Sequence, residues 1–124
     1  MNVGDVVVVH TTLARPPKDK ITVCVCTAPN QFLWINTNPA RHGVGQFELA
    51  GDDHAALDRP CFLDCSRLTT FSEEEMATAR NRGPITPNLA KRILEFIKEN
   101  PPSTLRGFQV DIVVDAMAYL CQSE

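Results

Sequence analysis

Long hydrophobic runs are absent from this chain of 124 residues. No apolar stretch approaches the ~18 residues that a membrane-spanning helix needs, so no membrane segment is expected. The N-terminal sequence MNVGDVVVVH has neither a basic segment nor a small-residue cleavage site, and it therefore does not resemble a signal peptide. These features predict a cytoplasmic protein that does not interact with a membrane.

An excess of charge of one sign is also lacking. The chain has 12 basic and 15 acidic residues, a formal net charge of −3 and a sequence pI of about 5.6. The bulk charge therefore does not indicate a strongly basic nucleic-acid binder, but it leaves room for a local basic patch. With 44% hydrophobic and 22% charged residues, the composition is globular rather than disordered, and the length suits one domain over residues 1–124.

Cysteine is present, but in an odd number and without a zinc-binding pattern. The five residues are Cys24, Cys26, Cys61, Cys65 and Cys121. Cys24 and Cys26 share one face of an expected strand, and so do Cys61 and Cys65, which leaves convergence on zinc as an alternative. Structural zinc sites favour C-x2-C pairs, however, and free cysteines are among the most buried residues. The sequence therefore predicts reduced thiols, no metal and no cofactor, and it contains no glycine-rich phosphate loop.

The first 70 residues have the apolar pattern of short strands. Their β-branched and aromatic residues alternate or form short runs between turn-forming segments. The predicted strands are Val3–His10, Ile21–Cys26, Phe32–Asn36, Gln46–Ala50 and Pro60–Ser66. Thr11–Lys20 holds two prolines and several charges, and it is therefore expected to be a loop. Five short strands joined by tight turns predict a small antiparallel barrel or a strongly bent sheet.

The apolar residues recur at helical spacing after residue 70. Ser72 with Glu75 forms a capping-box pattern, which predicts a helix running to about Asn81. Thr86 followed by Pro87 predicts a second helix over residues 86–99. A third helix is expected after Ser103 or Thr104. Its predicted buried face is Leu105, Phe108, Ile112, Ala116 and Leu120. The β-branched residues of this segment leave a strand over Gln109–Val114 as an alternative.

The predicted fold class is α+β: a β portion at 1–70, followed by a helical portion of two or three helices at 71–124. The opening GDVVVVH, a charged loop and then KITVCVC resemble the start of the MazF/PemK family of toxin endoribonucleases. The later stretch CFLDCSRLTTFSEEEMATARNRGPITPNLAKRILEFI is similar to that family's second half. The resemblance covers roughly residues 3–98. It implies an SH3-like barrel, a homodimer, cleavage of single-stranded RNA without a metal, and inhibition by an antitoxin protein.

The resemblance also implies site residues. It places an arginine at the start of the second strand and a serine or threonine at the end of the third, and these positions correspond to Lys20 and Thr37 as catalytic residues. Lysine lacks the planar fork with which arginine grips two phosphate oxygens. The expected substrate-binding residues, which lie in the loops around the second and third strands, are Arg15, Lys18, Arg41 and His42.

Trp34 and Phe32 offer either a platform for stacking RNA bases or one-sided core burial, and burial is the simpler interpretation of their alternating positions. The presence of lysine at position 20 keeps a second function open. In this alternative, the same barrel has lost catalysis and serves as a protein-interaction or regulatory module.

Overall fold

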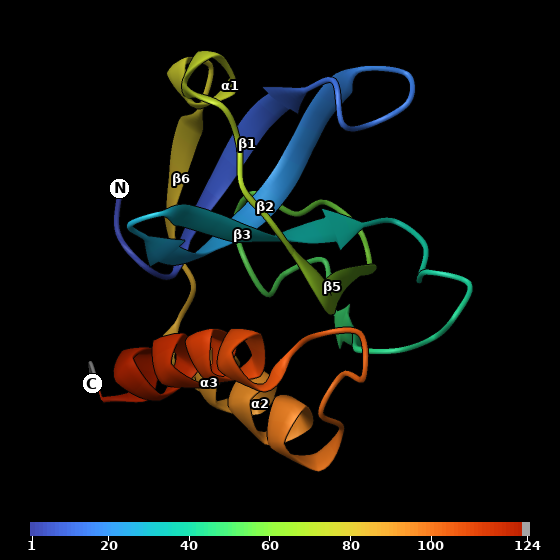
Figure 1. Cartoon of the computed structure of the whole chain (residues 1–124), viewed down its shortest axis with the longest axis vertical. Helices are drawn as coiled ribbons and strands as arrows, with labels where there is room; N and C mark the ends of the chain where they lie inside the picture. The colour runs from blue at the N-terminus through green and yellow to red at the C-terminus, as the bar shows by residue number, and fades with distance from the viewer. Residues whose placement is uncertain (123–124) are drawn as a thin grey trace.

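The computed structural model describes residues 1–122 as an antiparallel sheet with three helices (Figure 1). The six strands are β1 (Asp5–Thr11), β2 (Lys18–Thr27), β3 (Asn30–Asn36), β4 (Gln46–Leu49), β5 (Cys61–Thr69) and β6 (Arg80–Pro84). The helices are α1 (Glu73–Ala77), α2 (Pro87–Glu99) and α3 (Gly107–Cys121). The α+β class and the five strands of the first half are confirmed, and so is the second helix.

The strands form one sheet in the order β4-β5-β3-β2-β1-β6, and all its pairings are antiparallel. In Figure 1, β3 and β5 run across the direction of β1 and β2, so the sheet is strongly bent. Its two edges are β4 and β6, which are not paired with each other in the part of the chain that the structure describes. Irregular register in the β2–β3, β3–β5 and β1–β6 pairs accompanies this bend.

Each face of the sheet buries its own hydrophobic cluster. On one face, Val23, Leu33 and Leu63 pack with the buried sides of α2 and α3. On the other face, Val9, Phe32 and further apolar side chains pack near α1 and the loop after β1. In Figure 1, α2 and α3 lie together at one end of the molecule, and α1 lies at the opposite end. The alternation of side chains along each strand thus sends successive residues into different clusters.

The prediction for residues 72–81 is only partly right. The capping box of Ser72 and Glu75 is present, but α1 ends at Ala77 because Thr78 caps it by donating its hydroxyl to the Glu75 carbonyl. Residues 80–84 then form β6 instead of the last helical turn. This strand carries no apolar stripe, and it joins β1 through backbone pairing and through side chains such as Asn81, whose amide donates to Asp5 at 2.7 Å.

The third helix is present, and the alternative strand over residues 109–114 is wrong. The N-cap is Arg106, later than the predicted Ser103 or Thr104. The predicted buried face is partly right, because Ala116 and Leu120 are buried but Phe108 is 61% exposed. Val113 and Met117, which were not predicted there, are fully buried. A helix that is apolar on nearly all sides gives little periodic signal, so the sequence could not fix which side packs on the sheet.

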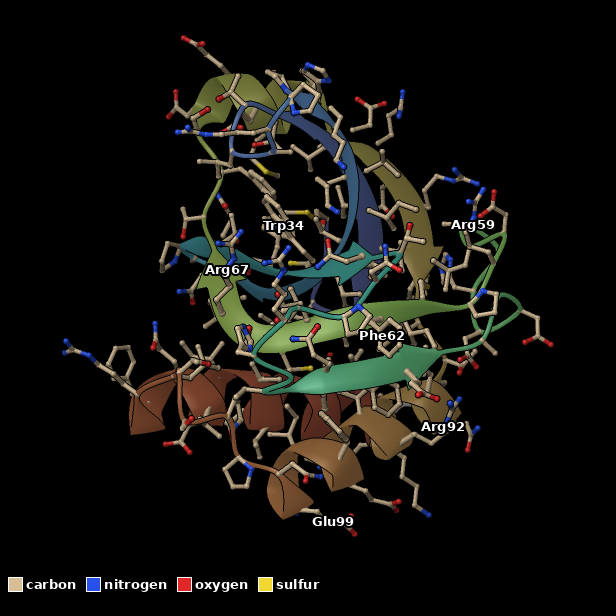
Figure 2. All side chains as sticks on the ribbon, turned by 90° about the vertical axis from the view of Figure 1, so that its right-hand side faces the viewer. Trp34, Arg59, Phe62, Arg67, Arg92 and Glu99 are labelled. Atoms are coloured by element: carbon tan, nitrogen blue, oxygen red, sulfur yellow. The ribbon has the colours of Figure 1, made fainter. Side chains whose placement is uncertain are left out.

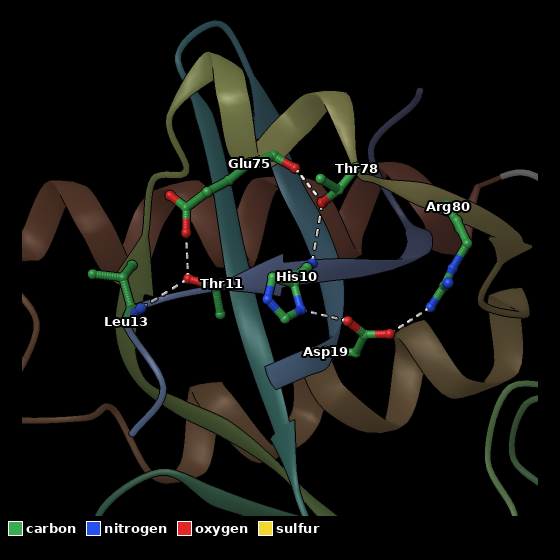
Figure 3. A network of polar contacts seen from close by, with 7 residues as sticks. All are labelled: His10, Thr11, Leu13, Asp19, Glu75, Thr78 and Arg80. Atoms are coloured by element: carbon green, nitrogen blue, oxygen red, sulfur yellow. Dashed lines mark hydrogen bonds and ion pairs between the residues drawn. The ribbon is translucent and has the colours of Figure 1, made fainter. Parts of the chain in front are cut away.

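A polar network links α1 with β1, β2 and β6 (Figure 3). The Thr11 hydroxyl donates to the Glu75 carboxylate. Asp19 accepts from the His10 ring and from Arg80, each at 2.9 Å. These bonds favour the ionised carboxylates: the bond from Thr11 lowers the pKa of Glu75, and the bonds from His10 and Arg80 lower the pKa of Asp19.

The lowered pKa of Glu75 predicts a loss of stability in acid. The folded-state pKa lies below the ordinary value of 4.5, so the stabilisation is present above pH 4.5 and disappears as the pH falls through the folded value. We expect the free energy of unfolding of the wild type to drop between about pH 5 and pH 3, and to drop less for Glu75→Gln. Urea unfolding at several pH values measures this difference. Equal pH dependence in the two proteins would contradict the assignment.

Candidate functional site

The predicted catalytic residues meet at one hollow, which we call the Lys20 hollow. It is lined by residues 18–21 of β2 and by residues 35–38 at the end of β3, and its volume is about 520 Å³. β2 extends beyond its pairing with β3, because Ile21 is opposite Ile35 and residues 18–20 pair only with β1. The hollow therefore lies between this extension of β2 and the segment that follows β3. Lys18, Lys20 and Thr37 all line it.

Lys20 is a buried strand residue, and this corrects the expectation of a loop over residues 11–20. Its side chain is 9% exposed, and Nζ donates to Oδ1 of Asn36 at 2.6 Å. Burial is the main cause that lowers the pKa of Lys20, and the positive charges of Lys18 and Arg67 lower it further. The opposing influence is the carboxylate of Asp64.

The indole of Trp34 contacts both Lys20 and a second cation, Arg67, which the sequence did not predict at this site. Nζ of Lys20 lies 5.2 Å from the ring centroid, and Cζ of Arg67 lies 4.9 Å from it. Figure 2 shows Trp34 and Arg67 close together beside β3 and β5, which are paired strands. Trp34 is only 8% exposed, and Phe32 is fully buried. The two rings are therefore core residues rather than a platform on which bases stack.

Polar side chains from β4 and β5 form a hydrogen-bonded group next to Trp34. Asp64 is buried and lies opposite Trp34 in the β3–β5 register. Its Oδ1 accepts from the Gln46 side chain and from the Ser66 backbone N–H, both at 2.9 Å, and from the Ser66 hydroxyl. In the part of the chain that the structure describes, Nε1 of Trp34 is the one buried side-chain N or O atom without a hydrogen-bond partner. An unpaired buried donor is costly, because the N–H group loses its hydrogen bond to water on folding.

The other predicted substrate-binding residues do not line the Lys20 hollow. Arg15 is exposed in the loop after β1, and Arg41 and His42 are exposed in the loop between β3 and β4. The His42 ring accepts from the Val44 backbone N–H at 3.0 Å, a contact within its own loop. Of the six predicted site residues, the structure thus brings Lys18, Lys20 and Thr37 together at this hollow. The second cation beside Lys20 is Arg67, and Asn36 holds the lysine.

One of the missed residues has a signal in the sequence, and the other does not. Asp64 is a charged residue inside the apolar segment PCFLDCS, and a buried charge requires partners. Arg67 lies just after the predicted strand end at Ser66, but β5 continues to Thr69. Because the predicted strand ended too early, Arg67 was not placed beside Trp34. Strand boundaries are the least certain part of a sequence-based prediction.

The thiols are dispersed over both faces of the sheet, and this arrangement does not bring four sulfurs together. Cys24 belongs to the cluster near α1, whereas Cys61 and Cys65 belong to the cluster under α2 and α3. Burial raises the pKa of Cys24 to about 11 and raises the pKa of Cys65 strongly. Among residues 1–122, no group of three or more His, Cys, Asp or Glu side chains is placed to hold a metal ion.

Burial predicts which thiols react in the folded protein. A thiol reacts as the thiolate, and buried thiols with raised pKa values form little of it. We expect Cys24 and Cys65 to resist a thiol reagent under native conditions and the partly exposed Cys26 and Cys121 to react. Mass spectrometry of peptides after brief labelling measures this order, and elemental analysis is expected to find no zinc. Labelling of Cys65 as fast as Cys121 would contradict the packing described above.

No family model, curated protein or solved structure matches this chain in the three comparisons. Within the described part of the chain, no helix is long and apolar enough to cross a membrane.

Proposed function

We propose that this protein binds single-stranded RNA through a backbone phosphate at the Lys20 hollow and cleaves it without a metal ion. The observation that carries this proposal is the joint placement of Lys20 and Thr37 along one hollow, with Lys18 beside them. This is the pair of positions that the resemblance to the MazF/PemK family identifies as catalytic. The proposal therefore rests on a sequence resemblance and on a site geometry that agrees with it.

The local charge supports an anionic ligand. Lys18 and Lys20 line the hollow, and Arg67 contacts the same indole as Lys20. Partly desolvated cations interact with phosphate more strongly than fully solvated ones, because the local dielectric is lower. The overall charge of −3 does not oppose this, since a local cluster of cations is sufficient to position a phosphate.

The chemistry proposed for the site is attack of the RNA 2′-hydroxyl on the adjacent phosphorus. The P–O bond to the 5′ oxygen breaks and a 2′,3′-cyclic phosphate forms. Lys20 and Arg67 would stabilise the charge that develops on the phosphorane, and the Thr37 hydroxyl would donate to a phosphate oxygen. Asp19 also lines the hollow, but its bonds to His10 and Arg80 lower its pKa and make it a poor proton acceptor.

The proposal includes the fold and partners that the resemblance implies. The bent six-stranded sheet would correspond to an SH3-like barrel, and the active form would be a homodimer inhibited by an antitoxin protein. Sedimentation at high micromolar concentration tests the dimer, and a monomer there would reject it. Growth arrest on induced expression, relieved by a neighbouring open reading frame, tests the toxin role.

A non-catalytic module is the second candidate, and the state of Lys20 favours it. Its amine is mostly buried and bonded to Asn36, and this limits the approach of a phosphate to its remaining N–H donors. In this case the hollow would bind an anion or a partner protein without cleavage.

Incubation of the full chain with a single-stranded RNA in EDTA separates the two candidates. The catalytic proposal expects cleavage that leaves a 2′,3′-cyclic phosphate, and it expects no cleavage at a 2′-deoxy position. RNA that is bound but never cleaved would favour the non-catalytic module. If the protein neither binds nor cleaves any single-stranded RNA, the RNA proposal is wrong.

A further inference from the structure

Lys20 differs from the other lysines of this chain in its surroundings. The chain has four lysines, and Lys18, Lys91 and Lys98 are exposed, whereas Lys20 is 9% exposed. Among residues 1–122, the one hydrogen bond of its amine is to Asn36, and Lys20 lines a hollow of about 520 Å³. This combination of a sheltered amine and an adjoining space is the arrangement in which a lysine acts as a nucleophile.

The cations near Lys20 have two effects. They favour the neutral form of its amine, and they attract an anion to it. Lys18 and Arg67 disfavour a further positive charge at Nζ, which increases the share of neutral amine. The same two cations attract a phosphoryl group. Asp64 opposes both effects, but its Oδ1 is already engaged by Gln46 and Ser66. The pocket thus combines a nucleophile with a place for the leaving phosphate.

We propose that Lys20 is a site of acylation by acyl phosphates, small metabolites in which an acyl group is joined to phosphate. Lys18, which lines the Lys20 hollow, and Arg67, which reaches it from the Trp34 ring, would hold the phosphoryl group while the neutral amine attacks the carbonyl carbon. The N–C bond forms, the C–O bond to phosphate breaks, and the amine proton leaves with the inorganic phosphate. This inference needs the hollow, Lys18 on its lining and Arg67 at the Trp34 ring, and it does not depend on RNA cleavage.

Acylation would change the character of the hollow. An acylated lysine has no positive charge, so the modification removes a cation and leaves an amide that donates a single hydrogen bond. If the hollow binds RNA phosphate, acylation of Lys20 would switch that binding off. The chemical state of one side chain would then link the protein to the supply of acyl phosphates.

The test uses acetyl phosphate and the intact protein, with mass spectrometry of each lysine over time. Holding the phosphoryl group beside the amine makes the transfer effectively intramolecular, so we expect Lys20 to be acetylated at least about tenfold faster than Lys91 or Lys98. Inorganic phosphate should slow the reaction at Lys20 alone. Arg67→Ala should remove most of this advantage, whereas Arg82→Ala, a matched change of an exposed arginine on β6, should leave it intact.

Acetic anhydride serves as the reagent without a phosphate. With this reagent we expect Arg67→Ala to slow the reaction at Lys20 much less than with acetyl phosphate, because only its effect on the charge of the amine is lost and there is no phosphoryl group to hold. Acetylation of Lys20 by acetyl phosphate no faster than that of Lys91 would overturn the proposal. Equal sensitivity to Arg67→Ala with both reagents would also overturn it, since Arg67 would then act on the amine and not on the phosphate.

Discussion

Replacement of Lys20 by alanine is expected to slow RNA cleavage by about 10² to 10³, or about 3 to 4 kcal/mol of transition-state stabilisation. The change removes the buried one of the two lysines that line the hollow, and it leaves Arg67 as the cation beside Trp34. Initial rates with a short single-stranded RNA measure the effect. RNA affinity, measured separately with a 2′-deoxy analogue, distinguishes loss of binding from loss of chemistry.

Two further variants make this prediction sharper. Lys20→Arg restores the residue type that the family resemblance expects, so it should retain cleavage. Lys91→Ala removes an exposed lysine of α2 and should leave the rate unchanged. Because Lys20 is buried, thermal unfolding of each variant must accompany the assays. Cleavage by folded Lys20→Ala at the wild-type rate would remove Lys20 from the site.

The largest loss of stability is expected from Met117→Ala on α3. Met117 is fully buried in the cluster that joins α2 and α3 to the sheet. Truncation of a buried methionine removes favourable packing and leaves a cavity, and it typically costs about 2–5 kcal/mol. Urea unfolding of the two proteins measures the difference.

Phe108→Ala is the control for this prediction. The sequence pattern places Phe108 on the buried face of α3, but the structure leaves it 61% exposed. We expect its truncation to change the free energy of unfolding by no more than about 0.5 kcal/mol. A larger loss from Phe108→Ala than from Met117→Ala would mean that α3 packs with the other side inward.

The strands of the first half were predictable because their apolar residues alternate between turn-forming segments. β6 was not, since Arg80–Pro84 carries no apolar pattern, and only its pairing with β1 makes it a strand. The third helix illustrates a related limit. Its sequence predicts a buried helix. A helix that is apolar on nearly all sides, however, does not show which face packs against the sheet.

The part of the candidate site that lies on β2 and at the end of β3 was predictable, because these strands are consecutive in the sequence. Lys18, Lys20 and Thr37 follow from the layout of β2 and β3, and the structure brings them to one hollow. Arg67 was not predictable, because its contact with Trp34 depends on the β3–β5 pairing, which brings together residues far apart in the chain. Arg41 and His42 were expected there because loops that are close in sequence were assumed to share one end of the sheet.

The place of β1 inside the sheet has a consequence for synthesis of the chain. β1 lies between β2 and β6, and β6 ends only at Pro84. While the chain is growing on the ribosome, one edge of β1 therefore stays open until more than two thirds of the protein has been made. α2 and α3, which cover one apolar face of the sheet, are synthesised after β6. The nascent chain thus exposes a valine-rich strand for most of its synthesis, which makes it a natural client for chaperones that bind at the ribosome.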